Sequence, residues 1–184
     1  MRVFISGPGG GGKSTLAREI SRRWDLPLRS LDDIHWIRDP AGDRRRPLDD
    51  KLARLAEVVA KDAWVIEGVQ FKWADMALER ADHIILLDPP FLRNQFQIVK
   101  RFIRQIRGTE KADYRPTLAT LVQLFRWSAD YRLHERALLF KKLEPFRDKA
   151  HVARSLPEAL ARLAETEDRL RSASGRDLQH GAAP

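Results

Sequence analysis

The residues best suited to chemistry form a phosphate-binding loop that begins at residue 7. Residues 7–15 read Gly-Pro-Gly-Gly-Gly-Gly-Lys-Ser-Thr, a complete G-x-x-x-x-G-K-[ST] motif. In such a loop the backbone N–H groups turn inward around phosphate oxygens, the lysine reaches the β and γ phosphates, and the serine hydroxyl ligates Mg²⁺. The predicted cofactor-binding residues are Gly7, Gly9, Gly10, Gly11, Gly12, Lys13, Ser14 and Thr15. The motif therefore predicts that the protein binds a triphosphate together with Mg²⁺.

Three acidic residues that follow predicted strands are candidates for work on the same phosphates. Glu67 and Asp88 each end an apolar run, and either can orient Mg²⁺ through water across from Ser14. Asp32 follows another run, where it can take a proton from an acceptor, hold a metal-bound water or cap the next helix. For Asp33 the helix cap is the favoured interpretation. Ligands of open α/β sheets bind beyond the carboxyl ends of the strands, so we expect these acids near the loop.

A basic helix is predicted over residues 91–107. Its basic residues are Arg93, Lys100, Arg101, Arg104 and Arg107. We interpret residues 93–116 as a lid in which Arg101 and Arg104 neutralise charge on a phosphoryl group during transfer. The alternative is a basic helix that faces DNA or solvent.

The elements that must position these residues alternate along the chain. Apolar, β-rich runs cover residues 2–6, 26–31, 64–68, 83–88 and 150–154, the last being the weakest. Helical patterns cover residues 16–24, 48–62, 76–80, 91–107, 117–146 and 156–171, and the fifth of these is expected to divide or kink before Pro145. This alternation predicts an α/β fold with a parallel sheet and right-handed crossovers.

The segment around residues 35–47 has two interpretations. Pro, Gly and Asp punctuate residues 38–47, which predicts a loop, and three successive arginines make it either substrate-facing or simply solvated. The preceding His35 and Trp36 either line an acceptor pocket or pack in the core.

Length and composition indicate one cytoplasmic domain over residues 1–171, followed by a flexible tail over residues 172–184. The absence of cysteine excludes disulfides, cysteine-ligated zinc and thiol catalysis. No apolar run approaches the length of a membrane span, and no signal-peptide pattern opens the chain, so we expect no membrane partner. The net charge of +8 suits anionic ligands, and it allows nucleic acid as a partner without requiring it.

Several of these features together resemble a known group of proteins. Beyond the phosphate loop, residues 31–32 with Trp36, residues 64–68, and residues 81–88 followed by an Arg-rich helix look like the bacterial DNA topology modulation (FlaR-type) proteins. These belong with the adenylate-kinase-like nucleoside and nucleotide kinases, and the resemblance spans roughly residues 1–165. It implies a three-layer sandwich with a five-stranded parallel sheet in the order 2-3-1-4-5 and the use of ATP with Mg²⁺. It also implies a lid between the helix after the fourth strand and the next helix, and an acceptor site above the second and third strands.

The sequence departs from adenylate kinase itself after the third predicted strand. Adenylate kinases usually carry Asp-Gly-Phe-Pro-Arg there, whereas this chain reads Glu-Gly-Val-Gln-Phe over residues 67–71. The arginine that would clamp an acceptor phosphate is missing at that point. A standard adenylate kinase is therefore disfavoured, and Glu67 stands where the family has an aspartate.

The leading hypothesis is an ATP-dependent phosphotransferase of the nucleoside and nucleotide kinase class, acting on a small hydroxyl or phosphate acceptor that the sequence does not identify. Lys13, Asp32, Arg101 and Arg104 are its predicted catalytic residues, and Ser14 with Glu67 or Asp88 its metal ligands. The competing hypothesis is an ATP-binding regulatory protein associated with DNA, with weak or no kinase activity.

Overall fold

The structure is a computed structural model that describes residues 1–39, 42–110 and 116–180 of the chain. Its centre is a parallel sheet of five strands: β1 (Arg2–Ser6), β2 (Leu28–Ser30), β5 (Trp64–Glu67), β6 (His83–Leu87) and β7 (Ala150–Ala153). The strands lie in the order β2-β5-β1-β6-β7. When only these five strands are numbered along the chain, their order is 2-3-1-4-5, as the resemblance implies. The labels differ from these numbers because β3 and β4 belong to a separate hairpin.

The three central strands owe their position to side chains that are apolar on both faces. Every residue of β5 and β6 is buried, and so is every residue of β1 except Arg2. Strand β1 pairs with both of the others, with Val3 opposite Val65 on one side and His83 on the other. The edge strands β2 and β7 are only partly buried, as expected for strands with one neighbour.

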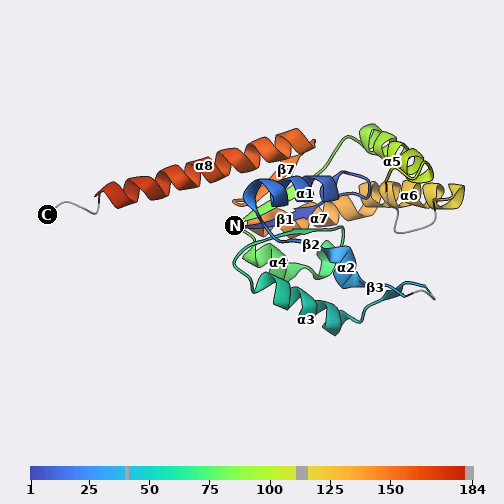
Figure 1. Cartoon of the computed structure of the whole chain (residues 1–184), viewed down its shortest axis with the longest axis horizontal. Coiled ribbons are helices and arrows are strands. Elements are labelled where there is room, and N and C mark those ends of the chain that lie inside the picture. The colour runs from blue at the N-terminus through green and yellow to red at the C-terminus, as the bar shows by residue number, and fades with distance from the viewer. Residues whose placement is uncertain (40–41, 111–115, 181–184) are drawn as a thin grey trace.

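Helices cover both faces of the sheet and give three layers (Figure 1). On one face, α1 (Lys13–Trp24) and α8 (Leu156–His180) pack against the sheet through Leu16, Ile20 and Leu163. On the other face lie α3 (Leu48–Val59), α4 (Asp75–Arg80) and α7 (Arg136–Leu143), whose apolar sides share a second core. The sheet therefore separates two apolar cores, as the α/β prediction requires.

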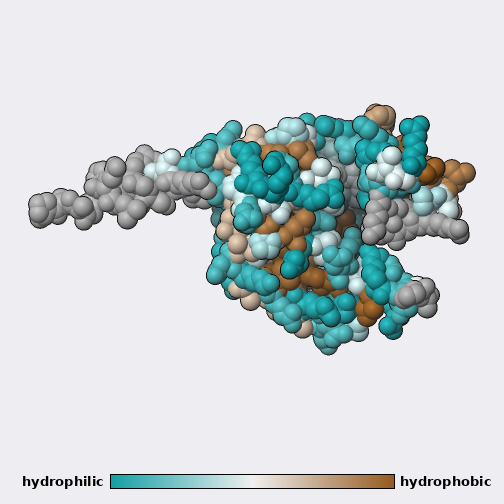
Figure 2. Space-filling view, viewed as in Figure 1, coloured by the Kyte–Doolittle hydropathy of each residue, from teal (hydrophilic) through white to brown (hydrophobic). Residues whose placement is uncertain are grey.

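Two further helices, α5 (Phe91–Ile106) and α6 (Leu118–Asp130), lie at the end of the molecule opposite the free end of α8 (Figure 1). The predicted lid over residues 93–116 corresponds to most of α5 and the segment after it, of which residues 111–115 lie outside the described residues. Figure 2 shows apolar surface near the tips of these helices. Exposed apolar residues of α5 and α6 include Leu92, Phe96 and Leu118, with exposed fractions of 81%, 68% and 76%.

The remaining elements are short. They are α2 (Leu31–His35), β3 (Trp36–Ile37), β4 (Arg44–Arg45), the 3₁₀ helices η1 (Phe71–Trp73) and η3 (Glu144–Phe146), and the π-helical turn η2 (Tyr131–Glu135). Strands β3 and β4 form an antiparallel hairpin, so the loop prediction for residues 38–47 was wrong at Arg44 and Arg45. The long helix predicted over residues 117–146 is divided by η2 and ends in η3, which contains Pro145.

The last helix is longer than the sequence pattern indicates. Its predicted end is near residue 171, whereas α8 continues to His180, and residues 181–184 lie outside the described residues. In Figure 1 its second half extends away from the body of the molecule. Within residues 1–39, 42–110 and 116–180, no helix is both long enough and apolar enough to cross a bilayer.

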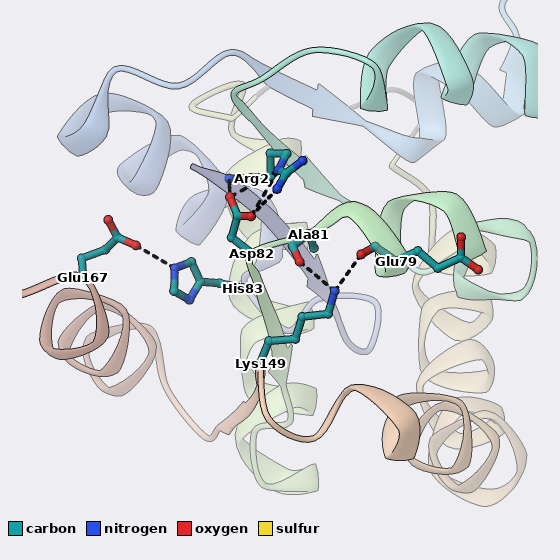
Figure 3. Close-up of polar contacts among 7 residues, drawn as sticks. All are labelled: Arg2, Glu79, Ala81, Asp82, His83, Lys149 and Glu167. Carbon is teal, nitrogen blue, oxygen red and sulfur yellow. Dashed lines mark hydrogen bonds and ion pairs between the residues drawn. The ribbon is translucent and has the colours of Figure 1, made fainter. Parts of the chain in front are cut away.

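Polar contacts fasten the end of the sheet at which the strands begin (Figure 3). The Arg2 guanidinium lies 2.6 Å from Asp82, whose carboxylate also accepts the backbone N–H of Arg2. Buried His83 contacts Glu167 of α8 across 2.7 Å. These contacts lie at the opposite end of the sheet from the phosphate loop, so they hold the fold together without entering the candidate site.

Candidate active site

The phosphate loop joins the end of β1 to the start of α1, and its shape requires glycine at two close approaches. Gly7 has φ +147°, and a Cβ there would lie 2.2 Å from the Leu87 carbonyl oxygen. Gly10 has φ +76°, and a Cβ there would lie 2.6 Å from Cγ1 of Ile98 on α5. Both positions combine a backbone conformation that other residues rarely adopt with no room for a side chain. The end of β6 and helix α5 therefore press directly on the loop.

The loop ends at the N-terminus of α1, which suits an anion. Gly12 is the N-cap residue with φ +94°, and no side chain in the described ranges caps this helix end. Gly11 donates its N–H to the Pro8 carbonyl at 3.2 Å, and Thr15 donates to Gly12 at 3.1 Å, which closes the turn. An uncapped helix N-terminus presents backbone N–H groups and a partial positive charge to a bound phosphate.

Lys13 is buried in the loop, and its ammonium group donates to the Pro8 carbonyl across 2.8 Å. Burial lowers the pKa of Lys13, the negative charges of Glu67 and Asp32 oppose this change, and the positive charge of Arg101 adds to it. These three residues from separate segments therefore all lie within electrostatic reach of the lysine. An incoming phosphate would replace the Pro8 carbonyl as the partner of the ammonium group.

Glu67 lies beside the loop serine at the end of β5. Its Oε1 atom accepts hydrogen bonds from the Ser14 hydroxyl at 3.3 Å and from the Ser30 hydroxyl at 3.0 Å. Glu67 is 7% exposed, so its carboxylate is held by these hydroxyls in a largely dry position. Hydroxyl and carboxylate oxygens are ligands that Mg²⁺ prefers, and the Ser14–Glu67 pair fits such an ion.

Asp88, the other candidate metal residue, makes its hydrogen bonds elsewhere. Its carboxylate accepts from Nε and Nη2 of Arg136 at 3.0 and 2.8 Å, and this pairing raises the pKa of Arg136. The backbone N–H of Asp88 donates to Ala153 on β7. The structure thus brings Glu67 to Ser14 and brings Asp88 to Arg136 on the helical layer.

Asp32 lies in the first turn of α2 and is exposed. The Gln70 side chain donates to its carboxylate from the segment after β5. The N-cap residue of this helix is Ser30, whose hydroxyl accepts the N–H of Asp32 at 3.3 Å. The interpretation of Asp32 and Asp33 as helix caps was therefore wrong, and neither carboxylate caps α2.

The two predicted lid arginines share one acidic partner. Arg101 and Arg104 lie 3.1 and 2.7 Å from the carboxylate of Glu110, just after α5. Arg101 still acts on the pKa of Lys13, so α5 carries it toward the loop. The Glu110 carboxylate therefore partly neutralises both guanidinium groups.

Polar residues that the sequence did not single out connect α5 and α6 to the loop. The Asn94 side chain donates to the Gly9 carbonyl at 3.1 Å and to the Ser128 hydroxyl at 2.9 Å, and Gln95 donates to the same hydroxyl. Asn94 and Ser128 are each only 2% exposed. Asn94 lies four residues before Ile98 on the buried face of α5, and a polar residue on an apolar face is the signal that could have identified it.

No protein-family model matches the chain, and no curated protein matches its sequence. Among solved structures, the chain is similar to a gluconokinase from Sinorhizobium meliloti 1021, with 19% sequence identity and a TM-score of 0.51. The alignment covers 94% of this chain and 97% of the gluconokinase. The chain therefore shares its fold with this solved structure over nearly its whole length, whereas the likeness to FlaR-type proteins is not confirmed.

Proposed function

We propose that the protein transfers the γ phosphate of Mg·ATP to a small hydroxyl or phosphate acceptor. The observation that carries this proposal is the arrangement of Lys13 and the Ser14–Glu67 pair around the uncapped start of α1. This arrangement offers a cradle for phosphates and oxygen ligands for the ion that accompanies them. The likeness to a kinase in fold supports the same class of reaction.

Each part of the site has a role in this proposal. The N–H groups of Gly9 to Lys13 surround the β phosphate, and Lys13 neutralises charge on the β and γ phosphates. Ser14 and Glu67 would hold Mg²⁺ at the loop, and we assign the metal-orienting role to Glu67 in preference to Asp88 because Glu67 is the acid that contacts Ser14. A bound Mg²⁺ would supply further neutralisation of the charge on the phosphates.

The acceptor side is assigned to Asp32 and the lid side to Arg101 and Arg104. An acceptor hydroxyl attacks the γ phosphorus, its proton passes to Asp32, and the bond from phosphorus to the bridging oxygen breaks to release ADP. The two arginines must exchange Glu110 for the transferring phosphoryl group, which bears the same kind of charge. Positioning and charge neutralisation then supply most of the rate.

Lys13→Ala tests the proposal, with Lys61→Ala at an exposed position as the matched control. ADP release is measured with Mg·ATP and a panel of nucleosides, nucleoside monophosphates and small hydroxy acids. We expect Lys13→Ala to abolish acceptor-dependent ADP release and Lys61→Ala to leave it intact, while both variants stay folded. Unchanged turnover in Lys13→Ala would refute the assignment of the loop to catalysis.

A further inference from the structure

A group of aromatic and cationic side chains lies beyond the carboxyl ends of β2 and β5, next to Asp32. We call it the cationic aromatic cluster, and it consists of His35, Trp36, Arg45, Lys51 and Trp73. Its members come from α2, the β3–β4 hairpin, the first turn of α3, and η1. Helix α2 directly follows β2, and η1 follows β5 by a few residues, so the cluster lies on the ligand side of the sheet.

The aromatic rings of the cluster contact one another around His35. The His35 ring lies edge-on to Trp36 with 4.8 Å between centroids, and it stacks against Trp73 at 6.2 Å with 15° between the planes. All three side chains are only partly buried. Each of these side chains therefore keeps some solvent-exposed surface that a ligand can contact.

Two cations lie against these rings, and neither of them pairs with a carboxylate among the described residues. The Arg45 guanidinium is 5.7 Å from the centroid of Trp36, its partner across the hairpin, and Lys51 Nζ is 5.9 Å from the centroid of Trp73. Lys51 is only 8% exposed, and in the described part of the chain its ammonium group makes no ion pair or hydrogen bond with an acidic group. The ammonium group therefore adds to the cluster a positive charge that is not paired within the described residues, and such a charge favours an anionic partner.

His35 contributes a further polar atom to the cluster. Nδ1 of His35 is buried and has no hydrogen-bond partner among the residues described. Burial lowers the pKa of His35, and the positive charges of Lys51 and Arg45 lower it further, whereas Asp32 acts in the opposite direction. Asp32 also acts on Lys13 in the phosphate loop. It therefore lies within reach of both the loop lysine and the cluster.

We infer that the cationic aromatic cluster binds the anionic group of the acceptor, a carboxylate or a phosphate, with Lys51 and Arg45 as its counter-charges. The acceptor is then an anionic hydroxy compound: its charge lies at the cluster, its hydrocarbon or ring face lies on the tryptophans, and its hydroxyl lies at Asp32. This inference rests on the proposed function for the direction of transfer. In adenylate kinases an arginine after the third strand of the sheet clamps the acceptor phosphate. The inference gives that role to the cationic aromatic cluster in this protein.

Tryptophan fluorescence provides a direct test because Trp36 and Trp73 belong to the cluster. Two pairs of probes are titrated: gluconate against glucose for a carboxylate, and AMP against adenosine for a phosphate. Saturating Mg·ADP is present in one series so that a probe cannot occupy the phosphate loop, and absent in the other. We expect at least one anionic probe to bind saturably and its neutral counterpart to bind at least about tenfold more weakly.

Variants identify the residues responsible. Lys51→Met and Arg45→Met should each weaken binding of the anionic probe by about tenfold or more. Arg44→Met is the matched control, because adjacent residues of a strand point to opposite faces, and it should bind as the unmodified protein does. Arg45 is exposed, so Arg45→Met keeps the test decisive even if Lys51→Met fails to fold.

The outcomes separate this inference from the proposed function. Binding of the neutral probes as tight as that of the anionic ones, no saturable anionic probe, or an equal loss in Arg44→Met would overturn the inference. Failure of Mg·ADP to bind would instead contradict the proposed function, and the series without nucleotide would still report on the cluster. The pair that responds shows whether the anion is a carboxylate or a phosphate.

Discussion

Replacing Glu67 by glutamine should weaken the use of Mg²⁺ while leaving the fold intact. The substitution keeps the size of the side chain and one acceptor oxygen, but it removes the negative charge beside Ser14. In the unmodified protein the Glu67 carboxylate accepts two hydrogen bonds, from the Ser14 hydroxyl at 3.3 Å and from the Ser30 hydroxyl at 3.0 Å. A glutamine oxygen can accept both, so the free energy of unfolding should change by no more than about 1 kcal/mol.

The effect on the metal should be far larger. Residues that orient a metal or its bound water typically contribute about 10–100-fold in metal affinity or activity. The charge of Glu67 also raises the pKa of buried Lys13, so its loss makes the charged form of the lysine less favourable. We therefore expect the Mg²⁺ concentration needed for half-maximal ADP release to rise by about 10–100-fold in Glu67→Gln.

Asp88→Asn is the matched comparison, because it makes the same chemical change at the other candidate acid. It removes the charge that pairs with Arg136 at 2.8 Å, where the Asp88 side chain is 11% exposed and the Arg136 side chain 38%. The partial exposure limits the expected loss of unfolding free energy to about 1–2 kcal/mol. Its Mg²⁺ dependence should match that of the unmodified protein.

The assay is ADP release at saturating ATP with Mg²⁺ varied, together with denaturant unfolding of each variant. We expect the raised Mg²⁺ requirement in Glu67→Gln and the loss of unfolding free energy in Asp88→Asn. If Asp88→Asn shifted the Mg²⁺ dependence and Glu67→Gln did not, the assignment of the metal-orienting acid would be reversed.

Three further predictions follow from contacts elsewhere in the structure. Asn94→Ala removes the hydrogen bonds to Gly9 and Ser128, so denaturant unfolding should show a loss of about 1–3 kcal/mol, and ATP titration a raised KM; an unchanged KM would mean that α5 does not position the loop. Burial, with the charges of His83 and Arg162, lowers the pKa of His151 below its ordinary 6.5, so near and below pH 6.5 the unfolded chain binds more protons than the folded one. The free energy of unfolding should therefore fall as the pH drops below 6.5, and thermal melting should show a smaller pH dependence in His151→Gln. Glu110 pairs with the α5 arginines, so duplex DNA should not bind near physiological salt, whereas tight binding that weakens steeply with salt would favour a DNA-associated regulatory role.

Much of the fold could be predicted because its central strands are buried on both faces. Residues of β1, β5 and β6 form short apolar runs, each followed by a helical pattern, and this alternation is visible in one sequence. The β3–β4 hairpin could not be predicted, because Arg44 and Arg45 lack an apolar alternation and pair with Trp36 and Ile37 only in the folded chain. The π turn that divides α6 from α7 likewise has no sequence signal of the kind that Pro145 provides.

The candidate site was predictable where its residues are consecutive and not where they come from distant segments. The loop over residues 7–15 is one motif, so its glycines, Lys13 and Ser14 could be identified directly. Ser30 reaches Glu67 across 37 residues, and Asn94 reaches Gly9 across 85. Glu67 and Asp88 are equivalent in the sequence, as acids at strand ends, and only side-chain geometry shows that Glu67 lies at Ser14 and Asp88 at Arg136.

Transfer of labelled γ phosphate tests the central claim most directly. The protein is incubated with Mg·ATP labelled at the γ position and with each nucleoside monophosphate or small hydroxy acid of the acceptor panel. The labelled product is then separated from free phosphate. The phosphotransferase account predicts label on an anionic hydroxy acceptor in amounts equal to the ADP formed, and none with Lys13→Ala. Label released only as inorganic phosphate, or no ADP formation with any acceptor while ATP binds, would contradict it.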